Sequence, residues 1–228
     1  MNGAELREAR VTAGCTQRDA AAKLGVTQAY LSMVERGVRP VSAELASRVV
    51  AVFAVPATAL SLGQYERRHR DELYFKQTLG ALGYGGFAYL GGGHAVNPAW
   101  LLMEAIDEED VDARVIEALP WLLLHYPALD WKWLTREAKI HDRQNRLAFL
   151  ASVAAGVAEM HGDDKLARQL AVQVDSLDPS RLAAEDTLCQ KSMTQAERRW
   201  LRVHATESAK HWNLLSHLTP DEVVHAFA

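Results

Sequence analysis

The sequence predicts an all-α protein, and three observations carry that prediction. Apolar residues recur at helical spacing through most of the chain, and no stretch keeps the strict alternation of a half-buried strand. Helix-capping residues and helix-ending glycines follow one another at short intervals, since a left-handed backbone costs glycine little. In the first sixty residues these signals predict four short helices, at residues 4–13, 17–24, 28–36 and 43–54.

The second and third of these helices are joined by a short turn at Gly25. Thr16 and Thr27 each stand where a helix cap is expected, and Ala20 and Ala21 are small enough for helices to cross closely. This is the helix-turn-helix pattern, which leaves its second helix protruding. A helical bundle with short loops fits the same spacing.

More specific residues lie in the segment LREARVTAGCTQRDAAAKLGVTQAYLSMVERGVRP, followed by SAELASRVVAVFAVP. This segment, about residues 4–60, resembles the lambda-repressor-like (Cro/C1-type, XRE) helix-turn-helix family. The resemblance implies a regulator that binds a double-stranded DNA operator as a homodimer, with recognition helices one DNA turn apart, about 34 Å. It also implies a partly buried ion pair between Arg10 and Glu35, and a Gln17 that contacts a phosphate and braces the third helix.

The same resemblance assigns most DNA contacts to the third helix. Gln28 matches a position that reads base edges, where a glutamine can bond adenine bidentately. Ala29 and Met33 stand where some phage repressors carry glutamine, so here they can only touch thymine methyls or sugars. The predicted contact residues are Gln17, Thr27, Gln28, Ala29, Tyr30, Ser32, Met33, Arg36 and Arg39.

Beyond residue 60 the helical signals continue. Helices are expected at residues 66–79, 99–106, 112–125 (broken at Pro120), 130–160, 164–174 and 197–211. Residues 80–98 hold seven of the chain's 14 glycines but lack the Walker spacing, so they predict a flexible connector pinned by Tyr84, Phe87 and Tyr89. The expected domains are residues 1–62 for DNA binding, 63–96 as a charged helix and connector, and 97–228 for partner binding and dimerisation.

Polar and aromatic residues cluster in the predicted partner domain. The run HDRQNR at residues 141–146 is polar on every side. It fits either a solvated turn between two shorter helices or a polar patch that meets a partner or completes a buried network. Large aromatic residues just before it are core or, if exposed, interface anchors. The candidate partner-binding residues are Trp131, Trp133, His141, Arg143, Asn145 and Arg146.

Several kinds of site lack their sequence signature. Nine histidines include His204 and His211, seven apart, but there is no HExxH, so neither a metal site nor a cofactor is predicted. No GxSxG elbow indicates a catalytic nucleophile, and the chain is not expected to be an enzyme. Cys15 and Cys189 form no CxxC. With no long apolar run and a charged N-terminus, a cytoplasmic protein without membrane contact is expected.

Charge is divided unevenly along the chain. Residues 1–60 carry a net charge of +2, whereas residues 61–228 carry −6. About residues 66–215 resemble regulators encoded beside AbiEii-type nucleotidyltransferase toxins, which implies an autorepressing antitoxin whose C-terminal region binds and neutralises a toxin. Two other hypotheses keep the DNA binding. In one the C-terminal region senses a small molecule in an apolar pocket, and in the other it is an enzyme.

Overall fold

The computed structural model describes residues 1–224, and these residues form two compact units. Unit 1 comprises Met1–Gly63 together with His94–Asn97. Unit 2 comprises Gln64–Gly93 and the chain from Pro98 onward. Most of the predicted connector, residues 64–93, therefore packs within unit 2.

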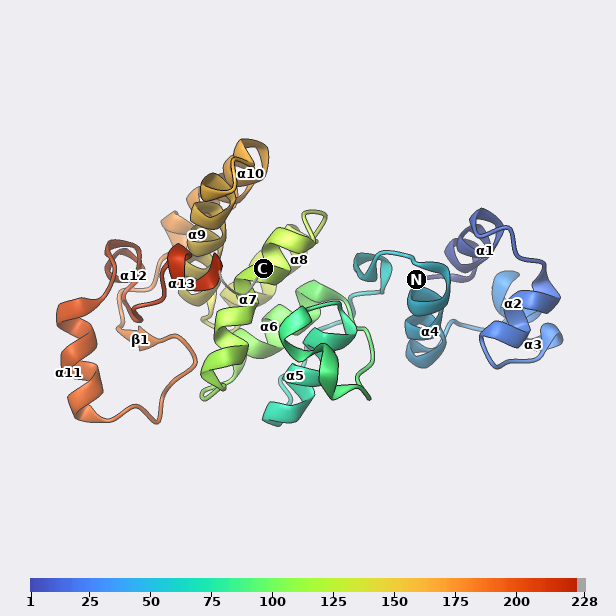
Figure 1. The fold of residues 1–228 in the computed structure, drawn as a ribbon, viewed down its shortest axis with the longest axis horizontal. Helices are drawn as coiled ribbons and strands as arrows, with labels where there is room; N and C mark the ends of the chain where they lie inside the picture. Colours follow the sequence, from blue (N-terminus) through green and yellow to red (C-terminus); the bar gives the residue numbers. More distant parts are fainter. Residues whose placement is uncertain (225–228) are drawn as a thin grey trace. The chain divides into compact units, whose positions relative to one another are not determined.

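Unit 1 is a four-helix domain (Figure 1). Its elements are α1 (Gly3–Thr12), α2 (Gln17–Lys23), α3 (Gln28–Glu35), α4 (Ala43–Phe53) and the 3-10 turn η1 (Ala57–Ala59). The side chains of one small apolar core hold the helices together: Leu6, Ala20, Ala21, Leu24, Leu31, Val34, Leu45 and Val49.

Each helix of unit 1 begins at a side chain that caps it. Thr16 accepts a hydrogen bond from the Asp19 amide and Thr27 accepts one from the Tyr30 amide. Such caps satisfy amides that the first turn leaves unpaired. Gly25 has a φ of 64° in the turn between α2 and α3, a conformation that favours glycine. The predicted helix-turn-helix geometry is therefore present.

Unit 2 is also helical, which confirms the predicted all-α class. Its helices are α5 (Glu72–Ala81), α6 (Pro98–Asp107), α7 (Ala113–His125), α8 (Trp131–Ile140), α9 (Gln144–Met160), α10 (Asp164–Leu177), α11 (Gln195–His204), α12 (Glu207–His211) and α13 (Pro220–Val224), with 3-10 turns η2 (Gly85–Leu90) and η3 (Asp178–Ser180). The strands β1 (Asp186–Thr187) and β2 (Leu214–Leu215) form one short parallel pair.

The central element of unit 2 is α9, which packs against α7, α8, α10, α12 and α13. Most of its residues are buried, and α10 runs back beside it (Figure 1). A helix covered on nearly all sides is expected to be apolar nearly all round, as α9 is beyond its first turn.

Three predicted helices have different bounds in the structure. The helix predicted at residues 66–79 begins only at Glu72, because Asp71 caps it and residues 64–70 are extended. The helix predicted at 130–160 is two helices, since Asp142 adopts a φ of 58° between α8 and α9. The helix predicted at 197–211 ends at His204, and Thr206 caps the separate α12. His204 and His211 therefore do not share one helical face.

The predicted break at Pro120 is wrong. Helix α7 runs from Ala113 to His125 with Pro120 inside it. A proline here removes one helical hydrogen bond. Pro120 and its neighbours Leu119 and Trp121 are buried, so tertiary packing outweighs the local cost.

The glycine-rich segment is a packed element in which Tyr84 and Phe87 are buried as predicted. Tyr89 is 74% exposed, so it does not anchor the segment as predicted. A Cβ at Gly80 would lie 2.6 Å from the Phe87 carbonyl oxygen, and one at Gly93 would lie 2.1 Å from the Gln77 carbonyl oxygen. Glycine is needed here because the backbone of this segment lies directly against α5.

Candidate nucleic-acid interface

The start of α3 is exposed. Thr27, Gln28 and Ala29 are exposed, whereas Leu31 and Val34 are fully buried in the core of unit 1. Residues three apart share a helical face, so Leu31 and Val34 point the same way and Ala29 lies on the opposite side, while Gln28 is exposed because it stands at the very start of the helix. The amide of Gln28 is thus presented at the start of a helix whose buried face is fixed.

The remaining predicted contact residues of α3 are less open. Tyr30 is half-buried and packs against the core of unit 1, and Ser32 and Met33 are also half-buried. Arg36 and Arg39, just beyond the helix, are exposed. The exposed surface therefore combines the first turn of α3 with two arginines at its other end.

A buried carboxylate locks α3 to the two preceding helices. Arg10 of α1 donates from Nε to Glu35 Oε1 at 2.6 Å and from Nη2 to Oε2 at 3.1 Å. Gln17 of α2 donates from Nε2 to Glu35 Oε2 at 3.0 Å. The Arg10 Nη1 also donates to the Cys15 carbonyl oxygen at 2.8 Å. One side chain thus ties α1, α2 and α3 together, which fixes the orientation of α3.

The environment of Glu35 also sets its charge. Burial alone would raise the pKa of the carboxyl, but hydrogen bonds from Arg10 and Gln17 hold it below its usual value. The pair is thus ionised at neutral pH. Because both side chains are nearly buried, removing one partner strands the other charge.

Residues 6–60 match the helix-turn-helix family. A relative of known role is the propionyl-CoA carboxylase regulator of Cereibacter sphaeroides, which is 42% identical over 65 residues. That match covers 28% of this chain and only 14% of the regulator's own length. No solved structure matches the chain. The family match thus concerns the helix-turn-helix, and unit 2 lies outside it.

Three of the predicted partner-binding residues are inside unit 2. Trp133 and Asn145 are buried, and Arg146 is 1% exposed. Arg146 pairs bidentately with Asp186 at 2.7 and 2.9 Å and donates to the carbonyl oxygens of Ile106 and Glu108. These side chains complete a buried network, so they cannot touch a partner in this fold.

Asn145 belongs to the same network. Its Nδ2 donates to the carbonyl oxygens of Leu182 and Trp212, and its Oδ1 accepts from the Leu182 amide. These bonds join the start of α9 to the two segments that precede β1 and β2. The polar run at residues 141–146 is therefore a turn followed by a buried network, which combines the two interpretations left open by the sequence.

The other three candidates keep some exposed surface. Trp131 lines a small cavity of about 250 Å³ beside α10. His141 and Arg143 both face Asp107, at 3.8 Å from His141 Nδ1 and 3.1 Å from Arg143 Nε. Arg143 also lies 3.5 Å from Glu109. Each is only partly accessible, and His141 and Arg143 already lie against a carboxylate.

The sequence analysis did not predict the ionic contacts between residues 64–70 and the end of α6. The extended residues 64–70 lie along the end of α6, where Arg70 pairs with Glu104 at 2.8 Å and Tyr65 bonds Asp107 at 3.1 Å. Arg67 also lies 3.7 Å from Asp107. A signal was present, because the basic run RRHR and the acidic run DEED have complementary charges.

Two further kinds of site are absent from residues 1–224. These residues contain no group of three or more His, Cys, Asp or Glu side chains placed to hold a metal ion. Over the same span no helix is both long and apolar enough to cross a bilayer.

Proposed function

We propose that the chain is a transcriptional regulator that binds double-stranded DNA in a sequence-specific way through α3. The observation that carries this proposal is the exposed first turn of α3, held rigidly by the Glu35 network on a domain that matches the helix-turn-helix family. A helix of this kind enters the major groove with its N-terminal residues against base edges.

The residues around α3 fit distinct roles in this proposal. Gln28 is suited to bidentate readout of an adenine, and Ala29 to contact with a thymine methyl. Arg36 and Arg39 are exposed and can reach phosphates, although Arg36 Nε also donates to the Ser32 carbonyl oxygen. The net positive charge of residues 1–60 favours the same contacts. Thr27, Tyr30, Ser32 and Met33 border this surface, and Gln17 keeps a second amide hydrogen for a phosphate.

The proposed DNA complex is a symmetric homodimer. A single module of this size covers few base pairs, and two recognition helices one DNA turn apart read a palindromic site. Footprinting on the DNA upstream of the chain's own gene, at two salt concentrations, tests this directly. We expect two protected half-sites about 10 base pairs apart, and protection that weakens as salt rises. Equal protection of unrelated DNA would refute sequence-specific binding.

For unit 2 we propose first an antitoxin role. Its support is the resemblance of residues 66–215 to regulators paired with nucleotidyltransferase toxins, and the net charge of −6 beyond residue 60. An acidic surface favours association with a basic partner face. Co-purification with the product of the adjacent gene, together with rescue of its toxicity, is the test; a toxin that neither binds nor is neutralised would exclude this role.

The second candidate for unit 2 is a sensor of a small molecule. The specific observation that favours it is a cavity of about 690 Å³ within unit 2. This volume lies within the roughly 300–1,000 Å³ range of small-molecule pockets. Apolar and polar side chains both line it, as a selective ligand site requires.

A further inference from the structure

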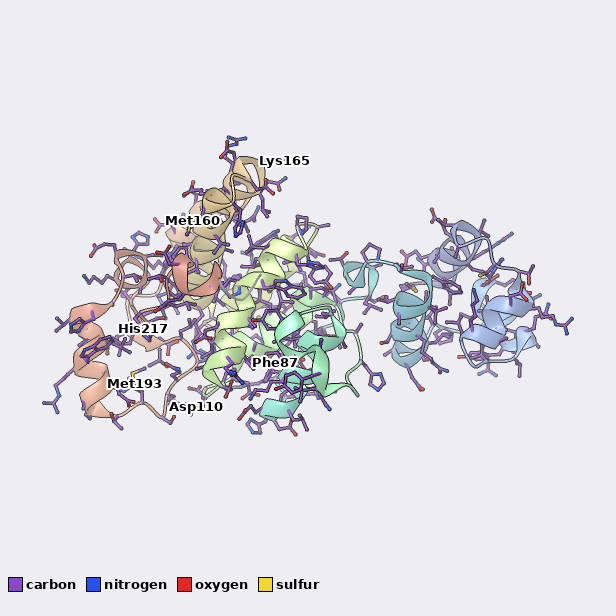
Figure 2. The ribbon with its side chains drawn as sticks, viewed as in Figure 1. Phe87, Asp110, Met160, Lys165, Met193 and His217 are labelled. Atoms are coloured by element: carbon purple, nitrogen blue, oxygen red, sulfur yellow. The ribbon has the colours of Figure 1, made fainter. Side chains whose placement is uncertain are left out.

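The 690 Å³ cavity lies between α5, the residues that precede α7, and α11. Figure 2 labels three of its wall residues, Asp110, Met193 and His217, which lie beside α11. All of the wall belongs to unit 2. The cavity is therefore a property of that unit alone.

The helix that forms one wall is weakly buried. Leu201 is the buried residue of α11, whereas Trp200 is 51% exposed and Val203 is 72% exposed. The Trp200 ring stacks on His204 with centroids 4.3 Å apart, and Trp200 also lines the cavity. Large apolar side chains are usually buried, so a half-exposed indole beside a cavity is unusual.

The opposite wall supplies a second aromatic ring and apolar surface. Phe75 of α5 is buried at the base of the cavity wall, and Val111 and Leu201 extend the apolar lining. A ligand bound here would bury an apolar body against these side chains, which is the main source of affinity in small-molecule sites.

Two carboxylates in the wall lack a cationic partner. Among residues 1–224, Asp110 accepts a hydrogen bond from the Ser192 amide, and Glu197 accepts from the amide and hydroxyl of Thr194. Hydrogen bonds from Ser192 and Thr194 hold the pKa of Asp110 and Glu197 below their usual values, and the charges of Lys191 and Arg146 add to the effect at Asp110, so both carboxyls are ionised at neutral pH. Among residues 1–224 neither carboxylate forms an ion pair within 4 Å, since Lys191 pairs with Glu109 and Arg146 with Asp186.

The other charges in the wall are already compensated. Arg70 pairs with Glu104 at 2.8 Å, and Lys76 is shared by Glu72 and Asp112, so all of these side chains have an ionic partner although one lysine serves two carboxylates. The unbalanced charge of the cavity is thus the negative charge of Asp110 and Glu197. An anionic ligand would meet repulsion there, whereas a cationic one would be attracted.

We propose that this cavity binds a small organic cation, with an ammonium or guanidinium group near Asp110 or Glu197 and an apolar body against Phe75 and Trp200. The cation can also bind the half-exposed indole of Trp200, since aromatic faces attract positive charge. This inference rests on the sensor role proposed for unit 2, and it names the chemical class of the effector.

The test uses three probes of similar shape and different charge: phenethylamine (cationic), 2-phenylethanol (neutral) and 3-phenylpropionate (anionic). Isothermal titration calorimetry of the full chain, without DNA, measures each affinity at low salt. We expect phenethylamine to bind at least about tenfold more tightly than the alcohol, because of its charge-assisted hydrogen bond. The anion should not bind. No binding of phenethylamine at millimolar concentration, or equal binding of the anion, would overturn the proposal.

Two variants locate the site. Trp200→Leu should weaken phenethylamine binding about 2- to 30-fold, through loss of the cation–π contact. Asp110→Asn keeps an acceptor for the Ser192 amide but loses the charge, and should weaken binding about tenfold. The matched control is Val203→Ala, which alters a more exposed residue of α11 outside the cavity wall. Circular dichroism verifies that each variant is folded.

The variant results decide between a specific site and binding elsewhere. Unchanged affinity in both Trp200→Leu and Asp110→Asn, with the folded state retained, would exclude this cavity as the site. DNA binding is measured separately with the same proteins and no probe. Failure of cation binding would then leave the DNA-binding proposal intact, and failure of DNA binding would leave the ligand result intact.

Discussion

Gln28 and Gln195 occupy the same position in their helices, directly after a threonine cap, and both are exposed. The two glutamines belong to different units, Gln28 to unit 1 and Gln195 to unit 2. If α3 reads DNA, Gln28→Ala should lose about 1–3 kcal/mol of binding free energy at one base pair of the operator. Gln195→Ala is the matched control and should leave DNA affinity unchanged. Fluorescence anisotropy with operators substituted at each position measures both.

The pattern of the loss across operator sequences identifies the kind of contact. A bidentate contact with adenine loses affinity at one position and relaxes specificity there. If Gln28→Ala instead lowers affinity equally for every DNA sequence, Gln28 contacts the backbone and base readout by this residue is refuted.

Glu35 offers a second test at the residue scale, on stability. Glu35→Ala strands the nearly buried Arg10 guanidinium and should cost about 3–5 kcal/mol of unfolding free energy. Glu44→Ala is its control, because the Glu44–Arg48 pair is exposed and worth at most about 1 kcal/mol. Urea unfolding of the full chain, followed by circular dichroism, gives both values. Equal costs would show that the Glu35 network does not hold the helices together.

The same carboxylate predicts a pH dependence. Its folded-state pKa is below the unfolded value, so the stabilisation is fully present above the ordinary pKa of about 4.3 and is lost as pH falls through the lower folded value. The stability difference between the wild-type chain and Glu35→Gln should therefore shrink between pH 7 and pH 3. An unchanged or larger difference at pH 3 would contradict ionisation of Glu35 in the folded state.

At the scale of elements, the glycine-rich segment makes a prediction that depends on position. Gly80→Ala places a methyl group against the Phe87 carbonyl oxygen and should destabilise unit 2 by about 1–3 kcal/mol. Gly85→Ala, in the same segment, meets nothing within 4 Å and should be neutral or stabilise by up to about 1 kcal/mol. Thermal unfolding distinguishes them. A Gly80→Ala protein as stable as Gly85→Ala would show that η2 does not lie closely against α5.

Some helix starts could be predicted from a local cap, whereas the caps Asp71 of α5 and Thr206 of α12 were missed. Thr16, Thr27 and Thr194 each cap the helix that was expected to follow. Helix ends and breaks were less predictable, because packing between distant segments decides them. The interruption at Asp142 has no glycine or proline to announce it, and Pro120 is tolerated inside α7 because its surroundings are buried.

At the scale of the whole molecule, the two units differ in how much the sequence reveals. Unit 1 carries a motif whose spacing implies its own geometry, so the surface around Gln28 could be outlined in advance. In unit 2, Arg146 and Asn145 looked like surface residues because their partners lie some 40 to 67 positions away in sequence. The cavity beside α11 escaped prediction for the same reason, since its walls come from three separate segments.

The measurement that tests the central claim most directly is selection of binding sites from a random duplex DNA library by the full chain. We expect one enriched, palindromic sequence. The logarithm of the chain's affinity for it should fall linearly with the logarithm of salt concentration. We also expect Gln28→Ala to relax a single position in each half-site. A chain that enriches no sequence above the starting library, while remaining folded, would contradict the assignment of α3 as a DNA-reading helix.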